Sequence, residues 1–132
     1  MVITDTELLV AGCDPVIRSY NLETGAVKLF AGHKGWVYCL LIHNKFLFSG
    51  GDDNIVRIWD LETTTQIEQL VAHRNGITQI CLANDHIFTG SFDHYNVMWD
   101  YKELMSRIAE KKQMRLEDIA SRKIETYNRI LN

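Results

Sequence analysis

Residues 50–60 read GGDDNIVRIWD, and this stretch decides the fold. Two glycines and two acids precede an apolar run that ends in a tryptophan next to an aspartate. Gly and Asp favour turns, whereas a run rich in Ile and Val is typical of a β-strand. The stretch therefore predicts a turn that leads into a strand, and its acids are either catalytic groups or parts of the fold.

The same pattern occurs three times along the chain. Residues 43–64 align with residues 84–104 at a shift of 40, apart from an offset at the turn, and with residues 4–25 at a shift of 39. An aromatic and an acidic position recur in all three units: Tyr20, Trp59 and Trp99, and Asp14, Asp53 and Asp93. Self-similarity at such a period indicates a repeat architecture.

The second unit contains four short segments with strand character. WVYCLLI (36–42), FLFSG (46–50) and NIVRIWD (54–60) are apolar runs separated by polar turns, and TQIEQLV (65–71) alternates apolar and polar residues. These patterns predict four antiparallel strands in about 40 residues. The fold class predicted for this part of the chain is all-β.

Gly32-His33 followed by SGGDDNIVRIWD (49–60) resembles the WD repeat, or β-transducin repeat, of β-propeller proteins. The resemblance covers residues 1–100 and is most specific in the second unit. It implies a partial WD-repeat β-propeller of about two and a half four-stranded antiparallel blades, followed by a C-terminal α-helix.

The resemblance also implies boundaries along the chain. A partial first blade, a complete WD repeat, a three-stranded last blade and an amphipathic basic helical extension are expected at residues 1–30, 31–72, 73–100 and 101–132. Met1 aligns with Leu40, in the middle of a strand, and no fourth strand follows Trp99. Because propellers contain about 4–8 blades, we expect a C-terminal fragment whose remaining blades are missing from this chain.

In this family a histidine, a Ser/Thr, the turn aspartate and the strand tryptophan form one hydrogen-bonded chain. Mapped onto matching positions, the resemblance implies this network in two units: His33, Ser49, Asp53 and Trp59, and His73, Thr89, Asp93 and Trp99. Each polar group is costly to bury unpaired, so mutual pairing favours a structural role over a catalytic one. The first unit retains only Asp14 of this set.

Turns at one face of a propeller form a composite docking surface. The positions that resemble the family's top-face contacts, and that we expect to bind protein, are Trp36, Tyr38, Asp52, Thr78 and Phe92. Aromatic anchors beside a charge are typical of protein hot spots. For Trp36, packing against the next blade is an equally good interpretation.

Composition narrows the possible classes of protein. Three cysteines without CxxC spacing predict reduced, buried thiols in a cytoplasmic protein, with a nuclear one as the alternative. No apolar run approaches the roughly 18 residues of a membrane helix, and the five histidines lack metal-ligand spacing. We therefore expect no membrane association, no metal, no cofactor and no enzymatic activity. An enzyme that uses the acidic turn is a rival hypothesis, which loss of activity in a folded Asp52→Asn variant would reveal.

The C-terminal segment has different chemistry. Residues 101–132 carry a net charge of +3 and no glycine or proline, against a net charge of -6 for residues 1–100. Asp100, as an N-cap with Glu103 three residues later, predicts the start of a helix. Two short apolar stripes on this helix favour docking of one face on the propeller or on a neighbouring chain, and they do not persist long enough for a coiled coil.

The sequence as a whole predicts a non-catalytic protein–protein interaction scaffold or adaptor that binds other proteins through the propeller top face and the C-terminal helix. The short turn IHNKF (42–46) is similar to propellers of F-box and TRAF-type ubiquitin-ligase adaptors, which implies a substrate-recruiting role. The alternative is a nucleic-acid-associated factor whose basic helix contacts phosphates through Lys111, Lys112, Arg115, Arg122 and Lys123. Interspersed acids and the lack of interleaved aromatics argue against this alternative, which a steep salt dependence of binding would reveal.

Overall fold

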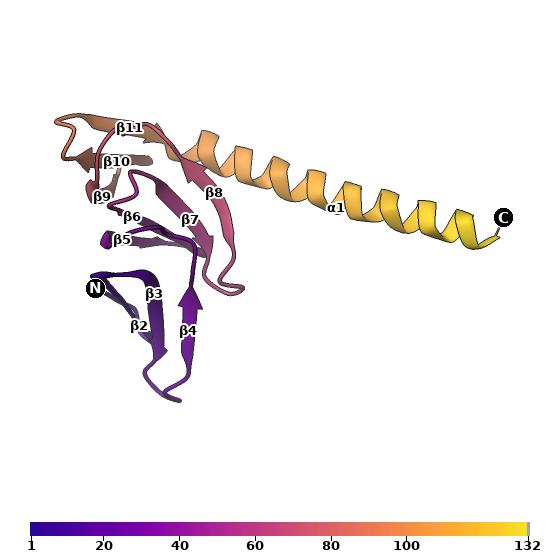
Figure 1. The fold of residues 1–132 in the computed structure, drawn as a ribbon, viewed down its shortest axis with the longest axis horizontal. Coiled ribbons are helices and arrows are strands. Elements are labelled where there is room, and N and C mark those ends of the chain that lie inside the picture. Colours follow the sequence, from indigo (N-terminus) through magenta and orange to yellow (C-terminus); the bar gives the residue numbers. More distant parts are fainter. Residues whose placement is uncertain (132) are drawn as a thin grey trace. The chain divides into compact units, whose positions relative to one another are not determined.

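The computed structural model describes the backbone of residues 1–131, and it describes every side chain among them except those of 114–116, 118–119 and 122–131. Its strands and helix are labelled in Figure 1. In chain order they are β1 (Val2–Ile3), β2 (Glu7–Gly12), β3 (Asp14–Asn21), β4 (Val27–Phe30), β5 (Val37–His43), β6 (Phe46–Gly51), β7 (Val56–Asp60), β8 (Gln66–Leu70), β9 (Ile77–Ala83), β10 (His86–Ser91), β11 (Asn96–Asp100) and α1 (Tyr101–Leu131). The chain divides near residue 100 into a strand unit and a helical unit.

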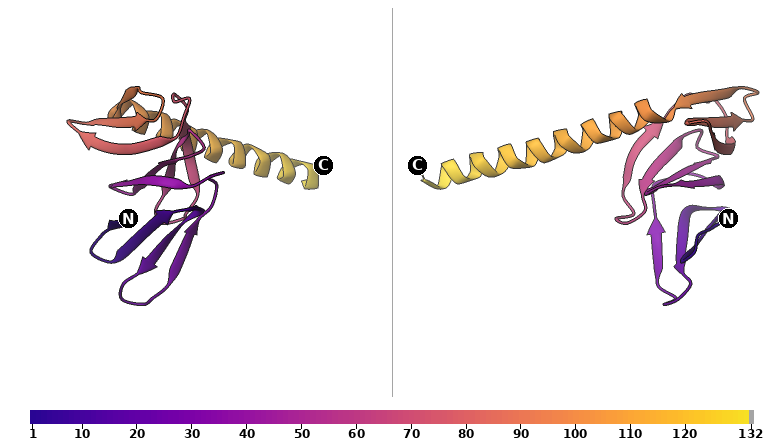
Figure 2. Two further views of the ribbon diagram at one scale, coloured as in Figure 1. Left: turned by 60° about the vertical axis from the view of Figure 1, so that its left-hand side comes forward. Right: turned by 180° about the vertical axis from the view of Figure 1, so that it is seen from behind.

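The strand unit consists of three antiparallel sheets. The first has the order β1-β2-β3-β4, the second β5-β6-β7-β8 and the third β11-β10-β9. Figures 1 and 2 show the sheets side by side in chain order, and β5 contacts both the first sheet, through β2 and β3, and the third, through β9. Three neighbouring sheets of four, four and three strands confirm the predicted partial propeller.

Strand β7 begins two residues later than the predicted strand 54–60. Asn54 has a φ of 67°, in the left-handed region that Asn tolerates better than most residues. The side chain of Asp53 accepts the Ile55 N–H at 3.4 Å, which closes the turn. His94 has a φ of 71° at the position of the third unit that corresponds to Asn54. The turn therefore includes Asn54 and Ile55, which the hydrophobicity pattern assigns to the strand.

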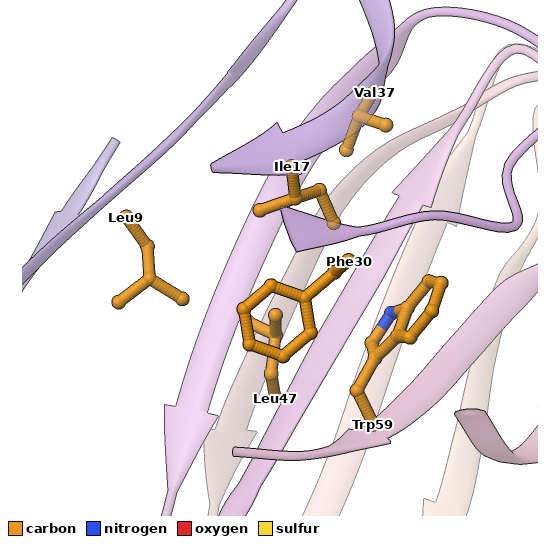
Figure 3. Close-up of a cluster of buried hydrophobic side chains, with 6 residues drawn as sticks. All are labelled: Leu9, Ile17, Phe30, Val37, Leu47 and Trp59. Carbon is orange, nitrogen blue, oxygen red and sulfur yellow. The ribbon is translucent and has the colours of Figure 1, made fainter. Parts of the chain in front are cut away.

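The first two sheets share one apolar core, which each supplies with three buried side chains. Figure 3 shows them together: Leu9, Ile17 and Phe30 from the first sheet, and Val37, Leu47 and Trp59 from the second. The rings of Phe30 and Trp59 meet edge to face with centroids 5.8 Å apart. Such aromatic pairs contribute about 0.5–1.5 kcal/mol beyond the area that they bury.

The second and third sheets approach each other at Gly50. A Cβ atom at this position would lie 2.6 Å from Cγ2 of Ile77, so only glycine fits there. The thiol of Cys39 lies at the same boundary, 3.5 Å from the Gly50 carbonyl oxygen and 3.7 Å from that of Ile77. A glycine thus sets how closely these two sheets pack.

The third sheet is less covered than the second. Phe88 and Met98 are 36% and 60% exposed, and Trp99 is only partly buried. Asn96 is exposed, whereas Ile17 and Val56 are fully buried at the corresponding positions of the other sheets. The polar residue in this strand is therefore solvated.

The prediction of buried thiols is wrong for two of the three cysteines. Cys13 and Cys81 are exposed, and only Cys39 is partly enclosed. Cys81 lies in β9 of the less covered third sheet, and Cys13 lies in the turn between β2 and β3. Burial of a cysteine here depends on whether a neighbouring sheet covers it, which cysteine spacing does not reveal.

We expect iodoacetamide to modify Cys13 much faster than Cys39 at pH 8. Burial raises the pKa of the Cys39 thiol to about 12, so almost none of it is the reactive thiolate at that pH. Peptide mass spectrometry over a time course measures both rates. In denaturant the two rates should converge, and equal rates in the folded protein would contradict the enclosed position of Cys39.

Helix α1 begins at Tyr101, directly after the predicted capping residue Asp100. The Glu103 N–H donates to Oδ1 of Asp100 at 3.1 Å, as expected for an N-cap. The described residues of α1 contain no stretch that is apolar enough to cross a membrane. The basic positions Arg115, Arg122 and Lys123 have side chains outside the described part of the structure.

Candidate functional site

A chain of hydrogen bonds runs through the second sheet. The Trp59 indole N–H donates to Oγ of Ser49 at 2.8 Å. Nε2 of His33 lies 2.6 Å from Oγ of Ser49, and Nδ1 of His33 lies 2.9 Å from Oδ2 of Asp53. Ser49 and Trp59 are buried almost completely, and His33 is 6% exposed. The four polar groups therefore satisfy one another away from water.

The third unit repeats this arrangement with a threonine in place of the serine. Nδ1 of His73 lies 2.9 Å from Oδ2 of Asp93, and Nε2 of His73 lies 2.8 Å from Oγ1 of Thr89. The Trp99 indole N–H donates to the same hydroxyl oxygen at 3.3 Å. The longer indole contact accompanies the partial exposure of Trp99.

Chemistry determines where the protons lie in the hydrogen-bond chain of the second sheet. An indole N–H only donates, so the Ser49 hydroxyl directs its own hydrogen to Nε2 of His33, and Nδ1–H of His33 donates to the carboxylate. Burial lowers the pKa of His33 by more than the neighbouring Asp53 raises it. The neutral imidazole with its hydrogen on Nδ1 is the form that fits these bonds.

Arg57 is a member of this network that the sequence reading missed. Its side chain is 5% exposed, and its Nε and Nη2 donate to Oδ2 of Asp53 at 3.2 and 3.1 Å. Its Nη1 donates to Oε1 of Gln66 at 2.7 Å. The signal was an arginine four residues after the turn aspartate, which Arg18 and Asp14 repeat in the first unit at 2.9 Å.

Serine, histidine and aspartate in hydrogen-bond contact are also the components of a hydrolase triad. Here the Ser49 side chain is fully buried, and its oxygen already accepts the Trp59 N–H. A nucleophile must reach a substrate carbonyl, and this hydroxyl faces the interior of the protein. The geometry of this group suits a structural role.

Stability should fall in acid because of Asp93. Burial would raise the pKa of this carboxyl, but the N–H groups of Tyr95 and Arg74 and the His73 ring lower the pKa to about 2, from an ordinary value of 3.8. Because the folded-state pKa is the lower one, the stabilisation is complete above about pH 4 and is lost as the pH falls toward 2. Urea unfolding midpoints between pH 5 and pH 2 measure this loss. In Asp93→Asn the decline over that range should be shallower, and an unchanged slope would contradict the assignment.

The expected protein-binding positions are exposed in the structure. Trp36 is 52% exposed, Tyr38 43% and Phe92 57%, and Asp52 and Thr78 are exposed as well. Half of the Trp36 surface is thus in contact with solvent. The structure brings Tyr38, Asp52 and Phe92 together, because the Tyr38 hydroxyl donates to Oδ1 of Asp52 at 3.4 Å and the Tyr38 and Phe92 rings meet edge to face. Thr78 instead donates to the Gly90 carbonyl oxygen at 3.3 Å.

Two of these positions are bulge residues. Val37 and Cys39 pair with Gly51 and Gly50, so Tyr38 between them has no opposite partner in β6. Thr78 is the equivalent extra residue in β9. A β-bulge re-aims the side chain of its extra residue without removing the ladder on either side.

The Trp36 backbone is tied to the turn that carries Asp52. The Asp52 N–H donates to the Trp36 carbonyl oxygen at 2.8 Å. The corresponding bond in the third unit joins the Phe92 N–H to the Gly76 carbonyl oxygen at 3.0 Å. The rigid strands thereby hold the exposed aromatic and acidic positions in fixed places.

Among the residues with described side chains, no three His, Cys, Asp or Glu side chains are grouped so as to hold a metal ion.

Comparison with known proteins relates this geometry to other chains. The chain matches the family model "WD domain, G-beta repeat" (WD40) over residues 25–60 and 64–100. It is 30% identical over 96 residues to THO complex subunit 6 of Homo sapiens. This alignment covers 64% of this chain and 28% of that protein. It is 33% identical over 103 residues to a U3 small nucleolar RNA-associated protein 15 homolog of Xenopus tropicalis. This alignment covers 73% of this chain and 20% of that protein.

Solved structures show the same fold. The WD40 β-propeller domain of Doa1 superposes with a TM-score of 0.67 at 28% identity, over 74% of this chain and 34% of that one. U3-55K superposes with a TM-score of 0.71 at 22% identity, over 77% of this chain and 35% of that one. The chain thus spans about a third or less of the length of these proteins. From its hydrogen-bonded repeats, its three sheets and the family match, the chain is a member of the WD40 repeat family.

Proposed function

We propose that this chain is part of a protein-interaction scaffold or adaptor whose partner binds the face formed by Trp36, Tyr38, Asp52 and Phe92. The observation that carries the proposal is the exposure of three aromatic side chains, Trp36, Tyr38 and Phe92, in or next to hydrogen-bonded strands, with the Tyr38 hydroxyl in contact with the Asp52 carboxylate. Large aromatic side chains are the usual anchors of protein interfaces, and rigid placement lowers the entropy cost of binding. WD40 repeat proteins in general act as interaction scaffolds.

Alanine variants of the full-length protein test the proposal. Trp36→Ala and Phe92→Ala should each reduce recovery of at least one co-purifying protein by about fivefold or more, as loss of a hot-spot residue does. Quantitative mass spectrometry of affinity-purified wild type and variants measures the change. Leu22→Ala is the matched control, because Leu22 is also 51% exposed but lies in the turn between β3 and β4. Equal recovery from all three variants would overturn the proposal.

We further propose that the partner belongs to a nuclear RNA-processing complex. Relatives are named as a small nucleolar RNA-associated protein and a pre-mRNA-splicing factor, which supports the nuclear alternative over a cytoplasmic location. Microscopy of a fluorescent fusion of the full-length protein tests this location, and exclusion from the nucleus would overturn it.

Direct contact with RNA through the basic helix is the second candidate, favoured by the same relatives. Lys111→Gln with Lys112→Gln would then weaken RNA binding and make it less dependent on salt. Binding that is carried only by proteins would leave RNA recovery unchanged in this double variant.

A further inference from the structure

Tyr38, Asp52 and Phe92, called here the aromatic–acidic cluster, meet at the boundary between the second and third sheets. The ring centroids of Tyr38 and Phe92 lie 6.2 Å apart, with the ring planes at 86°. The Tyr38 hydroxyl reaches Oδ1 of Asp52 at 3.4 Å. Because Phe92 belongs to the third unit and the other two residues to the second, the cluster exists only when the two sheets pack together.

Two glycines leave the cluster uncovered. A Cβ atom at Gly76 would lie 3.3 Å from Cε2 of Tyr38 and 3.4 Å from Cδ2 of Phe92. A Cβ atom at Gly35 would lie 3.1 Å from Cβ of Asp52. Larger side chains at either position would extend over the rings or the carboxylate. With glycine at both positions, the cluster stays accessible to another molecule.

The carboxylate of Asp52 lacks a cationic partner among the residues whose side chains are described. Its one side-chain hydrogen bond comes from the Tyr38 hydroxyl. The neighbouring residues Lys34 and Arg74 donate backbone N–H groups to Asp53 and Asp93, and neither side chain forms an ion pair with Asp52. Residues 1–100 carry a net charge of -6. An accessible carboxylate beside two aromatic rings is complementary to a positive charge.

We infer that the aromatic–acidic cluster binds an arginine side chain of the partner protein. A guanidinium group is planar, so it can stack on an aromatic ring and donate hydrogen bonds to a carboxylate at the same time. A lysine ammonium group is more strongly hydrated and cannot form the paired contact with a carboxylate. The inference rests on the proposed function, and it names the chemistry that this face recognises.

The test uses short random peptides on an array, probed with the full-length protein. Arginine should be enriched among the bound peptides. For the strongest of them, fluorescence anisotropy measures the Kd of the arginine peptide and of versions with citrulline or lysine at that position. Citrulline keeps the shape of arginine without its charge. We expect citrulline to weaken binding about tenfold and lysine to weaken it by several fold.

Variants of the protein connect this preference to Asp52. Asp52→Asn keeps an acceptor for Tyr38 and should weaken arginine peptides about tenfold while leaving citrulline peptides unchanged. Glu62→Gln removes one charge from an exposed residue of the turn between β7 and β8 and should change neither. Equal binding of arginine, lysine and citrulline peptides, or an unaffected Asp52→Asn variant, would overturn the inference.

The outcome can be separated from that of the proposed function. If Trp36→Ala and Phe92→Ala reduce the recovery of partner proteins but the peptides show no preference for arginine, the proposed interaction face is supported and the arginine assignment is wrong. If neither alanine variant changes the recovered proteins, the interaction face is wrong as well.

Discussion

Asp53→Ala is expected to lower the free energy of unfolding by about 3–5 kcal/mol, because it leaves a buried charge without its partner. The guanidinium of Arg57 would lose both of its contacts with Oδ2 and keep only Gln66. His33 would lose the acceptor of its Nδ1–H at the same time. Urea unfolding of the full-length protein, followed by circular dichroism, measures the change.

Asp93→Ala is the matched control for this experiment. Asp93 holds a histidine in the same way, but Val97 stands where the second unit has Arg57, so no buried guanidinium depends on it. The loss of stability should therefore be smaller than for Asp53→Ala. If Asp53→Ala does not fold, Asp53→Asn, which keeps an acceptor but not the charge, should give an intermediate loss. Equal losses at the two aspartates would show that Arg57 contributes nothing to the network.

Trp59→Ala is expected to cost about 3–5 kcal/mol of stability, as truncation of a buried aromatic side chain does. Trp59 is 1% exposed, packs against Phe30 and donates to Ser49. Its removal would open a cavity between the first two sheets and leave the serine hydroxyl without its donor. Trp59→Phe separates the two effects, because it keeps most of the ring volume and should cost about 1 kcal/mol for the lost hydrogen bond.

Trp99→Ala provides the comparison at the equivalent position of the third unit. Trp99 is only partly buried, and its indole bond to Thr89 is longer, at 3.3 Å. We expect a smaller loss than for Trp59→Ala, measured by the same denaturant titration. A larger loss would mean that the open face of the third sheet is covered in solution.

Contacts within one repeat follow from the sequence, because the same residue types recur at fixed offsets. His33 and Asp53 are 20 residues apart, as are His73 and Asp93, and both pairs form the same bond. Arg57 was harder to find, because the third unit has no arginine at that position. The partial propeller could be predicted for the same reason as the histidine bonds.

Contacts between repeats could not be predicted in this way. Tyr38 and Phe92 are 54 positions apart and belong to different units, and they meet only because Gly50 and Gly76 allow close packing between sheets. The exposure of Cys81 likewise depends on which sheet face is covered. Periodicity describes one sheet at a time, whereas these features arise from the placement of one sheet against the next.

The bulges at Tyr38 and Thr78 separate what the fold requires from what it displays. An extra residue with no opposite partner can be exchanged while the paired residues on both sides keep their hydrogen bonds. Replacing Tyr38 or Thr78 therefore leaves the histidine–aspartate bonds of both sheets in place. Protein engineers could change the binding specificity of this surface by exchanging those two side chains, because the paired strands that carry them would keep their structure.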